Sequence, residues 1–170
     1  MADIEKKQLQ DILLPWAQVT YVQKSATIDE VYQVALNSGH TRLPVKENGA
    51  VFGVLHTKEF ISLRESGETN WQSIVRSTLI LKPTDSALGA MRLLQDRKTH
   101  MAIVLSPQRQ LVGLVTLEDI LEEVVGDIFD EDDDGRVRKV YTAKIKARVI
   151  PSDNLLVPIS NTRLITVLSG

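Results

Sequence analysis

The chain has 170 residues, of which 43% are apolar, and a formal net charge of −2 at pH 7. This balance excludes a disordered chain and a strongly basic nucleic-acid-binding protein, and it allows a packed core. The chain lacks cysteine, which excludes a disulfide framework and cysteine-ligated zinc. We find no signal peptide and no apolar run near the roughly 18–20 residues of a transmembrane helix, so we expect a soluble chain.

The N-terminal part of the chain predicts a short helical lead-in and then a unit of strands and helices. Residues 1–10 are expected to form the lead-in, and a short strand is expected at about Val19–Val22. An amphipathic helix follows, because apolar side chains recur at helical spacing at Ile28, Val31, Val34 and Ala35. Two apolar strands flank the turn KENGA, whose Asn48-Gly49 pair is a strong hairpin signal, and a helix near Thr57–Arg64 closes the unit.

The same order of elements recurs when the sequence is laid over itself so that Val22 meets Leu81. A strand is expected at Leu79–Leu81, and the helix after it carries an apolar face formed by Ala87, Ala90, Met91 and Leu94. The stretch TRLPV then lies over HMAIV, and VFGVLHTKEFI lies over LVGLVTLEDIL. A second hairpin around SPQRQ and a helix near Leu117–Val125 complete the copy.

The two copies predict an α/β (α+β) fold made of tandem β-α-β-β-α repeats. Their hairpin strands are almost wholly apolar, as expected for a sheet covered by helices, and Gly53 of the first copy aligns with Gly113 of the second. The polar segment Arg64–Ser73 links the copies, and a basic stretch near the C-terminus suggests further strands. We therefore expect a lead-in at 1–10, repeats at 11–66 and 67–130, an acidic linker at 131–136 and a β-rich tail at 137–170.

Thr116 and Asp119 stand where a predicted strand becomes a helix. A helix that begins at Leu117 leaves free backbone N–H groups and a partial positive charge in its first turn. The local interpretation is a capping arrangement, in which the threonine hydroxyl satisfies one N–H group and Asp119 stands at the third helical position. The spacing alone favours this interpretation over a ligand contact, although the two are compatible.

Acidic residues follow this helix and raise the question of a metal site. Asp130, Asp132 and Asp134, with Gly135, imitate the start of a calcium loop, but Tyr141 stands where that loop requires a bidentate acid, so the match fails. We interpret residues 127–134 as a solvated connector. The alternative is a site for Mg²⁺, either as the free ion or as the counter-ion of a nucleotide.

No catalytic motif is found in the sequence. It contains no G-x-S-x-G, H-E-x-x-H, P-loop or G-x-G-x-x-G pattern, and its three histidines are scattered along the chain without a clear acid or nucleophile partner. A nucleic-acid-binding surface requires basic residues interleaved with aromatic ones, and this sequence lacks that pattern. We therefore expect neither an enzyme nor a nucleic-acid-binding protein.

Four stretches of the chain resemble a known family. They are DILLPW, SGHTRLPV, GVLHTKEF and GLVTLEDILEEVVGDIFDEDDD, and they lie between Asp11 and Asp134. The pattern resembles the CBS-domain pair, or Bateman module, of CorC/HlyC and CNNM-like proteins, and the last stretch is the most specific. Leu14 departs from the usual threonine of the first stretch, and residues from Gly135 on do not match the C-terminal domain that many family members carry.

The resemblance implies a pseudo-two-fold module that binds AMP or ATP, with Mg²⁺ as an optional companion, in the cleft between the repeats. It implies that Thr116 and Asp119 hydrogen-bond the ribose hydroxyls and that Thr41 and Arg42 approach the phosphates, for which the fixed charge of a guanidinium is well suited. The nucleotide-binding set that follows from the resemblance is His40, Thr41, Arg42, Leu43, Pro44, Met101, Ala102, Ile103, Thr116 and Asp119.

The first repeat departs from this pattern. His56 and Glu59 stand where the second repeat has threonine and aspartate. Glutamate can still accept from a ribose, but histidine is larger and titratable, so we expect one competent site rather than two. His40 stands where the family often has an aromatic residue, which leaves stacking on adenine and a structural role both open.

The resemblance also implies partners and a location. It implies homodimers in which two modules meet through the helices at 28–37, 57–64, 87–96 and 117–125. It implies a membrane domain outside this chain, with a role in Mg²⁺ or Co²⁺ transport or homeostasis, and a position at the cytoplasmic face of the plasma membrane. The alternative is a ligand-free module that only dimerises and positions that membrane domain.

Overall fold

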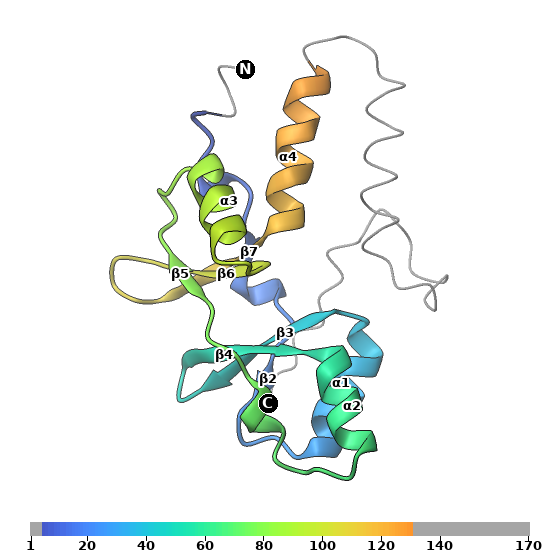
Figure 1. Cartoon of the computed structure of the whole chain (residues 1–170). Helices are drawn as coiled ribbons and strands as arrows, with labels where there is room; N and C mark the ends of the chain where they lie inside the picture. The colour runs from blue at the N-terminus through green and yellow to red at the C-terminus, as the bar shows by residue number, and fades with distance from the viewer. Residues whose placement is uncertain (1–4, 131–170) are drawn as a thin grey trace. The chain divides into compact units, whose positions relative to one another are not determined.

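The structure is a computed structural model that describes residues 5–130 (Figure 1). Within these residues it contains four α-helices and two β-sheets, a mixed α and β architecture that agrees with the predicted class. The predicted linker at 131–136, the predicted tail at 137–170 and the side chains of residues 127–130 lie outside the described part of the chain. None of the described helices is both long and apolar enough to span a bilayer.

The contacts divide the chain into two compact units, which we describe separately. The first unit comprises residues 17–78, and the second comprises residues 5–16 and 79–130. The sequence similarity suggests boundaries at 11–66 and 67–130, whereas the contacts place residues 11–16 in the second unit and residues 67–78 in the first. The physical reason is core burial, because Leu9 and Ile12 belong to the core of the second unit and Trp71 belongs to the core of the first.

The first unit is a three-stranded sheet with two helices packed on one face. Its strands lie in the order β2 (Val22–Gln23), β3 (Arg42–Glu47) and β4 (Ala50–His56), with β2 parallel and β4 antiparallel to β3. The helices are α1 (Ile28–Ser38) and α2 (Thr57–Glu65), and a 3-10 turn, η3 (Trp71–Ile74), follows. The buried side chains that join helices, strands and turn are Val22, Val31, Ala35, Leu43, Val45, Leu55, Phe60 and Trp71.

Local sequence signals account for the ends of these elements. Thr27 caps α1 through a reciprocal arrangement with Glu30, and Gly39, in the left-handed region at φ 64°, ends the helix. The β3–β4 turn is formed by Asn48 at φ 49° and Gly49 at φ 82°, as a tight primed turn requires. The predicted hairpin and the predicted apolar face of α1 are therefore confirmed.

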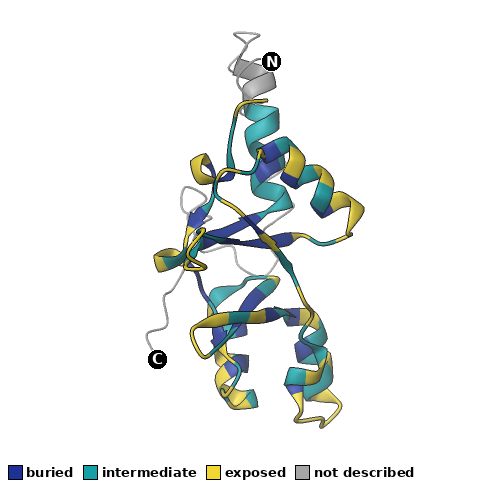
Figure 2. Cartoon of the chain, turned by 90° about the vertical axis from the view of Figure 1, so that its left-hand side faces the viewer, coloured by how far each residue is buried: buried dark blue, intermediate teal, exposed yellow. Residues whose placement is uncertain are grey.

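The second unit repeats this architecture with one additional strand. Its sheet has the order β1 (Leu14–Pro15), β7 (Leu111–Thr116), β6 (Met101–Leu105) and β5 (Leu79–Leu81), and only the β5–β6 pair is parallel. Helices α3 (Ala87–Asp96) and α4 (Leu117–Asp130) pack on the sheet. Figure 2 shows the nearly continuous burial of β6, which is typical of a strand between neighbours and under helices.

Two expected elements differ from the sequence prediction. The lead-in is not a helix over the described residues 5–10. It holds a turn, a bridge from Gln8 to Ser86 and the start of a 3-10 turn, η1 (Leu9–Asp11), because its backbone bonds to the segment before α3 instead of to itself. The strand expected at Val19–Val22 begins only at Val22, and a further 3-10 turn, η2 (Trp16–Gln18), precedes it.

The aligned glycines of the two repeats have a common structural reason. A Cβ atom at Gly53 would lie 2.5 Å from the carbonyl oxygen of Arg76, and one at Gly113 would collide with the carbonyl oxygen of Leu14. In each unit another backbone segment therefore lies directly against the second hairpin strand. We call it the crossing segment; it is the chain at Arg76 in the first unit and β1 in the second. Val54 exchanges two backbone hydrogen bonds with Arg76, and β1 pairs with β7. Only glycine allows such a close approach.

Candidate functional site

Each unit contains the same junction, at which the second hairpin strand runs into a helix. In the second unit β7 ends at Thr116 and α4 begins at Leu117, and Thr116 lies opposite Met101 in the sheet. In the first unit β4 ends at His56, which lies opposite Arg42. The candidate residues of the sequence prediction therefore fall into two groups, one at each junction.

At the second-unit junction Thr116 caps the helix. Its hydroxyl oxygen accepts a hydrogen bond from the backbone N–H of Asp119 at 3.1 Å, and the backbone N–H of Leu117 donates to the carbonyl oxygen of His100 at 2.9 Å. The predicted capping interpretation is thus confirmed for Thr116. Asp119 is half-buried in the first turn of α4, where the partial positive charge of the helix end favours its carboxylate. This junction holds an acid in the first helical turn, and the backbone N–H of that acid bonds to a hydroxyl.

The predicted site residues on β6 of the second unit offer little exposed side chain. Met101, Ala102 and Ile103 are all buried, and Ala102 belongs to the core of the unit. Their sheet register fixes the start of β6 against the end of β7. In the first unit Leu43 and Pro44 are likewise buried on β3, so the exposed part of the predicted set is confined to a few polar residues.

The first-unit junction carries those polar residues on the stretch 40–42. Thr41 is exposed, and His40 and Arg42 are half-buried. Hydrogen bonds join the main chain of this stretch to α2. The hydroxyl of Thr57, at the start of α2, donates to the carbonyl oxygens of His40 at 2.9 Å and Thr41 at 3.1 Å. The backbone N–H of Thr57 also donates to the Thr41 carbonyl oxygen at 2.9 Å. The main chain directly before Arg42 is therefore anchored to the start of α2.

His56 occupies the capping position of the first-unit junction but makes no capping bond. Its Nδ1 atom is buried and finds no hydrogen-bond partner among residues 5–130, and its side chain does not cap α2. Burial holds the pKa of His56 below its ordinary value, and the positive charge of Arg42 lowers it further. A neutral imidazole therefore stands where the second unit has a hydroxyl.

Glu59, the counterpart of Asp119, is engaged within the first unit. The Arg76 guanidinium donates to the Glu59 carboxylate at 2.7 Å, and the backbone of Arg76 is held by its pairing with Val54. Arg76 was missed by reasoning from sequence, because it lies between the predicted linker Arg64–Ser73 and the predicted strand Leu79–Leu81, where no motif or periodicity marks it. The two junctions thus differ in the residue at the capping position.

The structure brings residues 40–44 together on one unit and Thr116 with Asp119 on the other. The composite site that unites both groups stays a prediction. Among residues 5–130, no group of three or more histidine, aspartate and glutamate side chains is arranged to hold a metal ion. The metal candidates Asp132 and Asp134, and the side chain of Asp130, lie outside the described part of the chain.

Comparison with protein families gives a match that covers both repeats. The model of the CBS domain matches residues 9–66 and residues 72–126. Among curated proteins, the magnesium and cobalt efflux protein CorC of Salmonella typhimurium is 32% identical over 154 residues, which cover 85% of this chain and 53% of that protein. The CorC protein of Escherichia coli K12 is 30% identical and matches over 88% of this chain and 54% of its own length. The chain spans about half the length of the curated relatives it matches.

Solved structures show the same fold. The CBS domain of a bacterial CNNM/CorC family Mg²⁺ transporter in complex with ATP has a TM-score of 0.67 and 27% identity, over 74% of this chain and 92% of that one. A CBS-domain pair with bound AMP from Klebsiella pneumoniae has a TM-score of 0.64 and covers 71% of this chain and all of the other. Its identity of 20% supports the fold alone.

Proposed function

This chain belongs to the CBS-domain family, and on that premise we propose that it is a regulatory module that binds an adenine nucleotide, AMP or ATP. The proposed context is the cytosolic part of a CorC-like membrane protein, at the cytoplasmic face of the plasma membrane, in divalent metal ion transport or homeostasis. The observation that carries the proposal is the second-unit junction, where Asp119 stands in the first turn of α4 and its backbone N–H bonds to the hydroxyl of Thr116. The ATP complex of a related CBS domain supports it.

The chemistry of the junction suits a ribose. A carboxylate can accept hydrogen bonds from two vicinal hydroxyl groups at once, as acidic residues do in dinucleotide-binding folds. The Thr116 hydroxyl, which accepts from the backbone, still has its own hydrogen to donate. Adenine and phosphate contacts are proposed for the remaining predicted residues, with Arg42 as the phosphate ligand because a guanidinium binds phosphate with two parallel hydrogen bonds.

Mg²⁺ enters this proposal only as the companion of the nucleotide. It usually keeps several waters and is held by phosphates with one or two carboxylates. The family is not a catalytic one, and we propose that the module senses the nucleotide without converting it. Occupancy can shift the packing of modules only through a difference in affinity between two arrangements.

The proposed partners are a second copy and a transport domain outside this chain. The second copy is proposed to dock through helices α1, α2, α3 and α4, and the half-exposed Leu36 on α1 offers an apolar contact for it. The second candidate function is a ligand-free scaffold. It is favoured by the first-unit junction, where Arg76 already engages Glu59 and no capping hydroxyl is present.

Calorimetric titration with ATP and with AMP tests the proposal. We expect binding that Asp119→Ala weakens by about tenfold or more, since hydrogen bonds to a charged group contribute about 1.5–3 kcal/mol. Glu59→Ala is the matched control, because it removes the equivalent acid from the first unit and should leave the affinity within about twofold. Absence of binding to wild-type protein would instead leave the scaffold function.

A further inference from the structure

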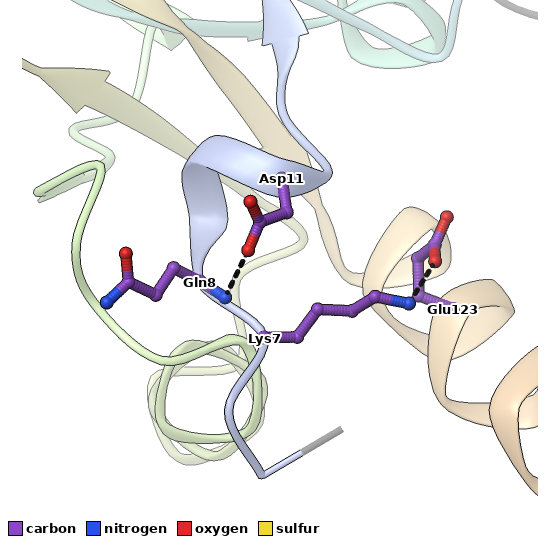
Figure 3. A network of polar contacts seen from close by, with 4 residues as sticks. All are labelled: Lys7, Gln8, Asp11 and Glu123. Carbon is purple, nitrogen blue, oxygen red and sulfur yellow. Dashed lines mark hydrogen bonds and ion pairs between the residues drawn. The ribbon is translucent and has the colours of Figure 1, made fainter. Parts of the chain in front are cut away.

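Residues 7–15 form a continuous strap along the second unit. At the outer end, the Lys7 ammonium contacts the Glu123 carboxylate of α4 at 2.9 Å, and the Gln8 backbone N–H donates to the Asp11 carboxylate at 2.9 Å (Figure 3). At the inner end, Leu14 lies opposite Leu114 and Pro15 opposite Gly113 in the β1–β7 pair. The strap therefore touches both a helix and a strand of this unit.

The middle of the strap is buried in the core. Leu9 is 0% exposed and Ile12 is 3% exposed, and both pack within the second-unit core. The backbone N–H of Leu9 donates to the Asp85 carbonyl oxygen at 3.0 Å, and the Lys7 carbonyl oxygen accepts from Ala87, the first residue of α3, at 2.8 Å. The strap thus satisfies one of the open N–H groups at the start of α3.

The two ends of the strap flank the candidate ribose site. Leu114, opposite Leu14, is two residues before Thr116 on the same strand. Glu123 is four residues after Asp119 on α4, and residues at this spacing share one face of a helix. The strand-to-helix junction that carries Thr116 and Asp119 is therefore held at both sides by the same nine-residue segment, counted from Lys7 to Pro15.

The charged contact at the outer end is more enclosed than an ordinary surface pair. The Lys7 and Glu123 side chains are 26% and 34% exposed. The chain offers a matched pair in the first unit, Lys24 with Glu47 at 3.0 Å, whose side chains are 31% and 42% exposed. The second pair has the same chemistry and similar burial, but it belongs to the other unit.

We propose that the strap is an occupancy-sensing element, in which docking of residues 7–15 and nucleotide binding at the Thr116–Asp119 junction reinforce each other. This inference rests on the proposed nucleotide-binding function. Because coupling between two equilibria is reciprocal, a bound nucleotide tightens the strap, and loosening the strap weakens the nucleotide. Nucleotide occupancy of the junction then changes how tightly the N-terminal residues of the strap are docked.

The test combines hydrogen exchange with calorimetric titration on the full chain. Saturating ATP is expected to slow exchange of the Leu9 and Gln10 amides by about fivefold or more, and Lys7→Ala is expected to weaken ATP binding by about three- to tenfold. Lys24→Ala, the matched control, should change neither quantity. A melting curve of each variant verifies that it is folded.

A double variant separates docking from simple charge attraction to the phosphates. Lys7→Ala with Glu123→Ala removes one positive and one negative charge together. If the strap acts through docking, the double variant binds ATP as weakly as Lys7→Ala alone. If its affinity returns to that of the wild type, only through-space charge is involved and the inference is overturned.

The outcomes also separate this inference from the proposed function. ATP binding that depends on Asp119 but leaves strap exchange unchanged, with Lys7→Ala equal to Lys24→Ala, overturns the strap inference alone. Absence of any ATP or AMP binding to the wild type overturns both. Slower strap exchange with ATP together with weaker binding by the double variant supports both.

Discussion

His56 shows how one residue changes a repeated junction. It replaces the capping hydroxyl that Thr116 supplies in the other unit, and its buried Nδ1 atom has no hydrogen-bond partner among the described residues. Since burial and Arg42 lower the pKa of His56, the folded protein disfavours its protonation. At a pH between the lowered value and the ordinary one, the unfolded chain therefore binds more protons than the folded chain.

The replacement His56→Thr tests this account. A threonine at the capping position should add about 1 kcal/mol to the free energy of unfolding, and it removes the unpartnered ring nitrogen. The sign of the pH effect follows from the lowered pKa: the wild type loses stability as pH falls below the ordinary histidine value, and the variant loses less over that window. Urea unfolding at pH 7.5 and at pH 5.5 measures both quantities. An equal loss in the two proteins would contradict the role of His56.

The crossing segments opposite Gly53 and Gly113 determine which element can lie beside the second hairpin strand of each unit. Each places a backbone carbonyl where a side chain would otherwise stand, so the second hairpin strand can accept a further neighbour. In the second unit that neighbour is β1, which brings the strap to the strand that ends at Thr116. A single glycine thus positions both the sheet edge and the candidate site.

The replacement Gly113→Ala is expected to destabilise the protein by about 3 kcal/mol, because the new methyl group meets the Leu14 backbone and must push β1 away from β7. Gly126→Ala is the matched control with the opposite sign. Gly126 lies inside α4 and has no described heavy atom within 4 Å of an added Cβ, so alanine should stabilise the helix by about 1 kcal/mol. Chemical unfolding curves of both variants provide the measurement, and a neutral Gly113→Ala would refute the close approach.

Elements with strong local signals were predictable from the sequence. The helix starts at Ile28 and Leu117 and the turn at Asn48 follow from capping residues and left-handed backbone positions, which depend only on near neighbours in the chain. The course of residues 5–16 was not predictable, because Leu9 and Ile12 find their partners about seventy residues away or more in the second unit. Among the site residues, the Thr116 cap could be predicted, whereas the pairing of Glu59 with Arg76 required the crossing segment.

At the scale of the whole molecule, the chain crosses from one unit to the other more than once. It begins in the second unit, forms the first unit as residues 17–78 and then returns. Dividing the chain between the predicted repeats, at residues 66 and 67, therefore separates residues that belong to the same compact unit. The core of the second unit depends on residues of the lead-in, and the loss of even one buried leucine costs about 2–5 kcal/mol.

Fragments test this dependence directly. Residues 79–130 alone should fail to unfold cooperatively, because removing Leu9, Ile12 and Leu14 leaves cavities whose combined cost approaches the whole stability of a small domain, about 5–15 kcal/mol. The same fragment joined through a glycine–serine linker to residues 5–16 should regain a cooperative thermal transition, monitored by circular dichroism. Linking it to a variant segment with Leu9→Ala and Ile12→Ala should not restore the transition. If residues 79–130 fold cooperatively without the segment, residues 5–16 are not required for folding of the unit, and neither the core packing nor the strap has the role assigned to it.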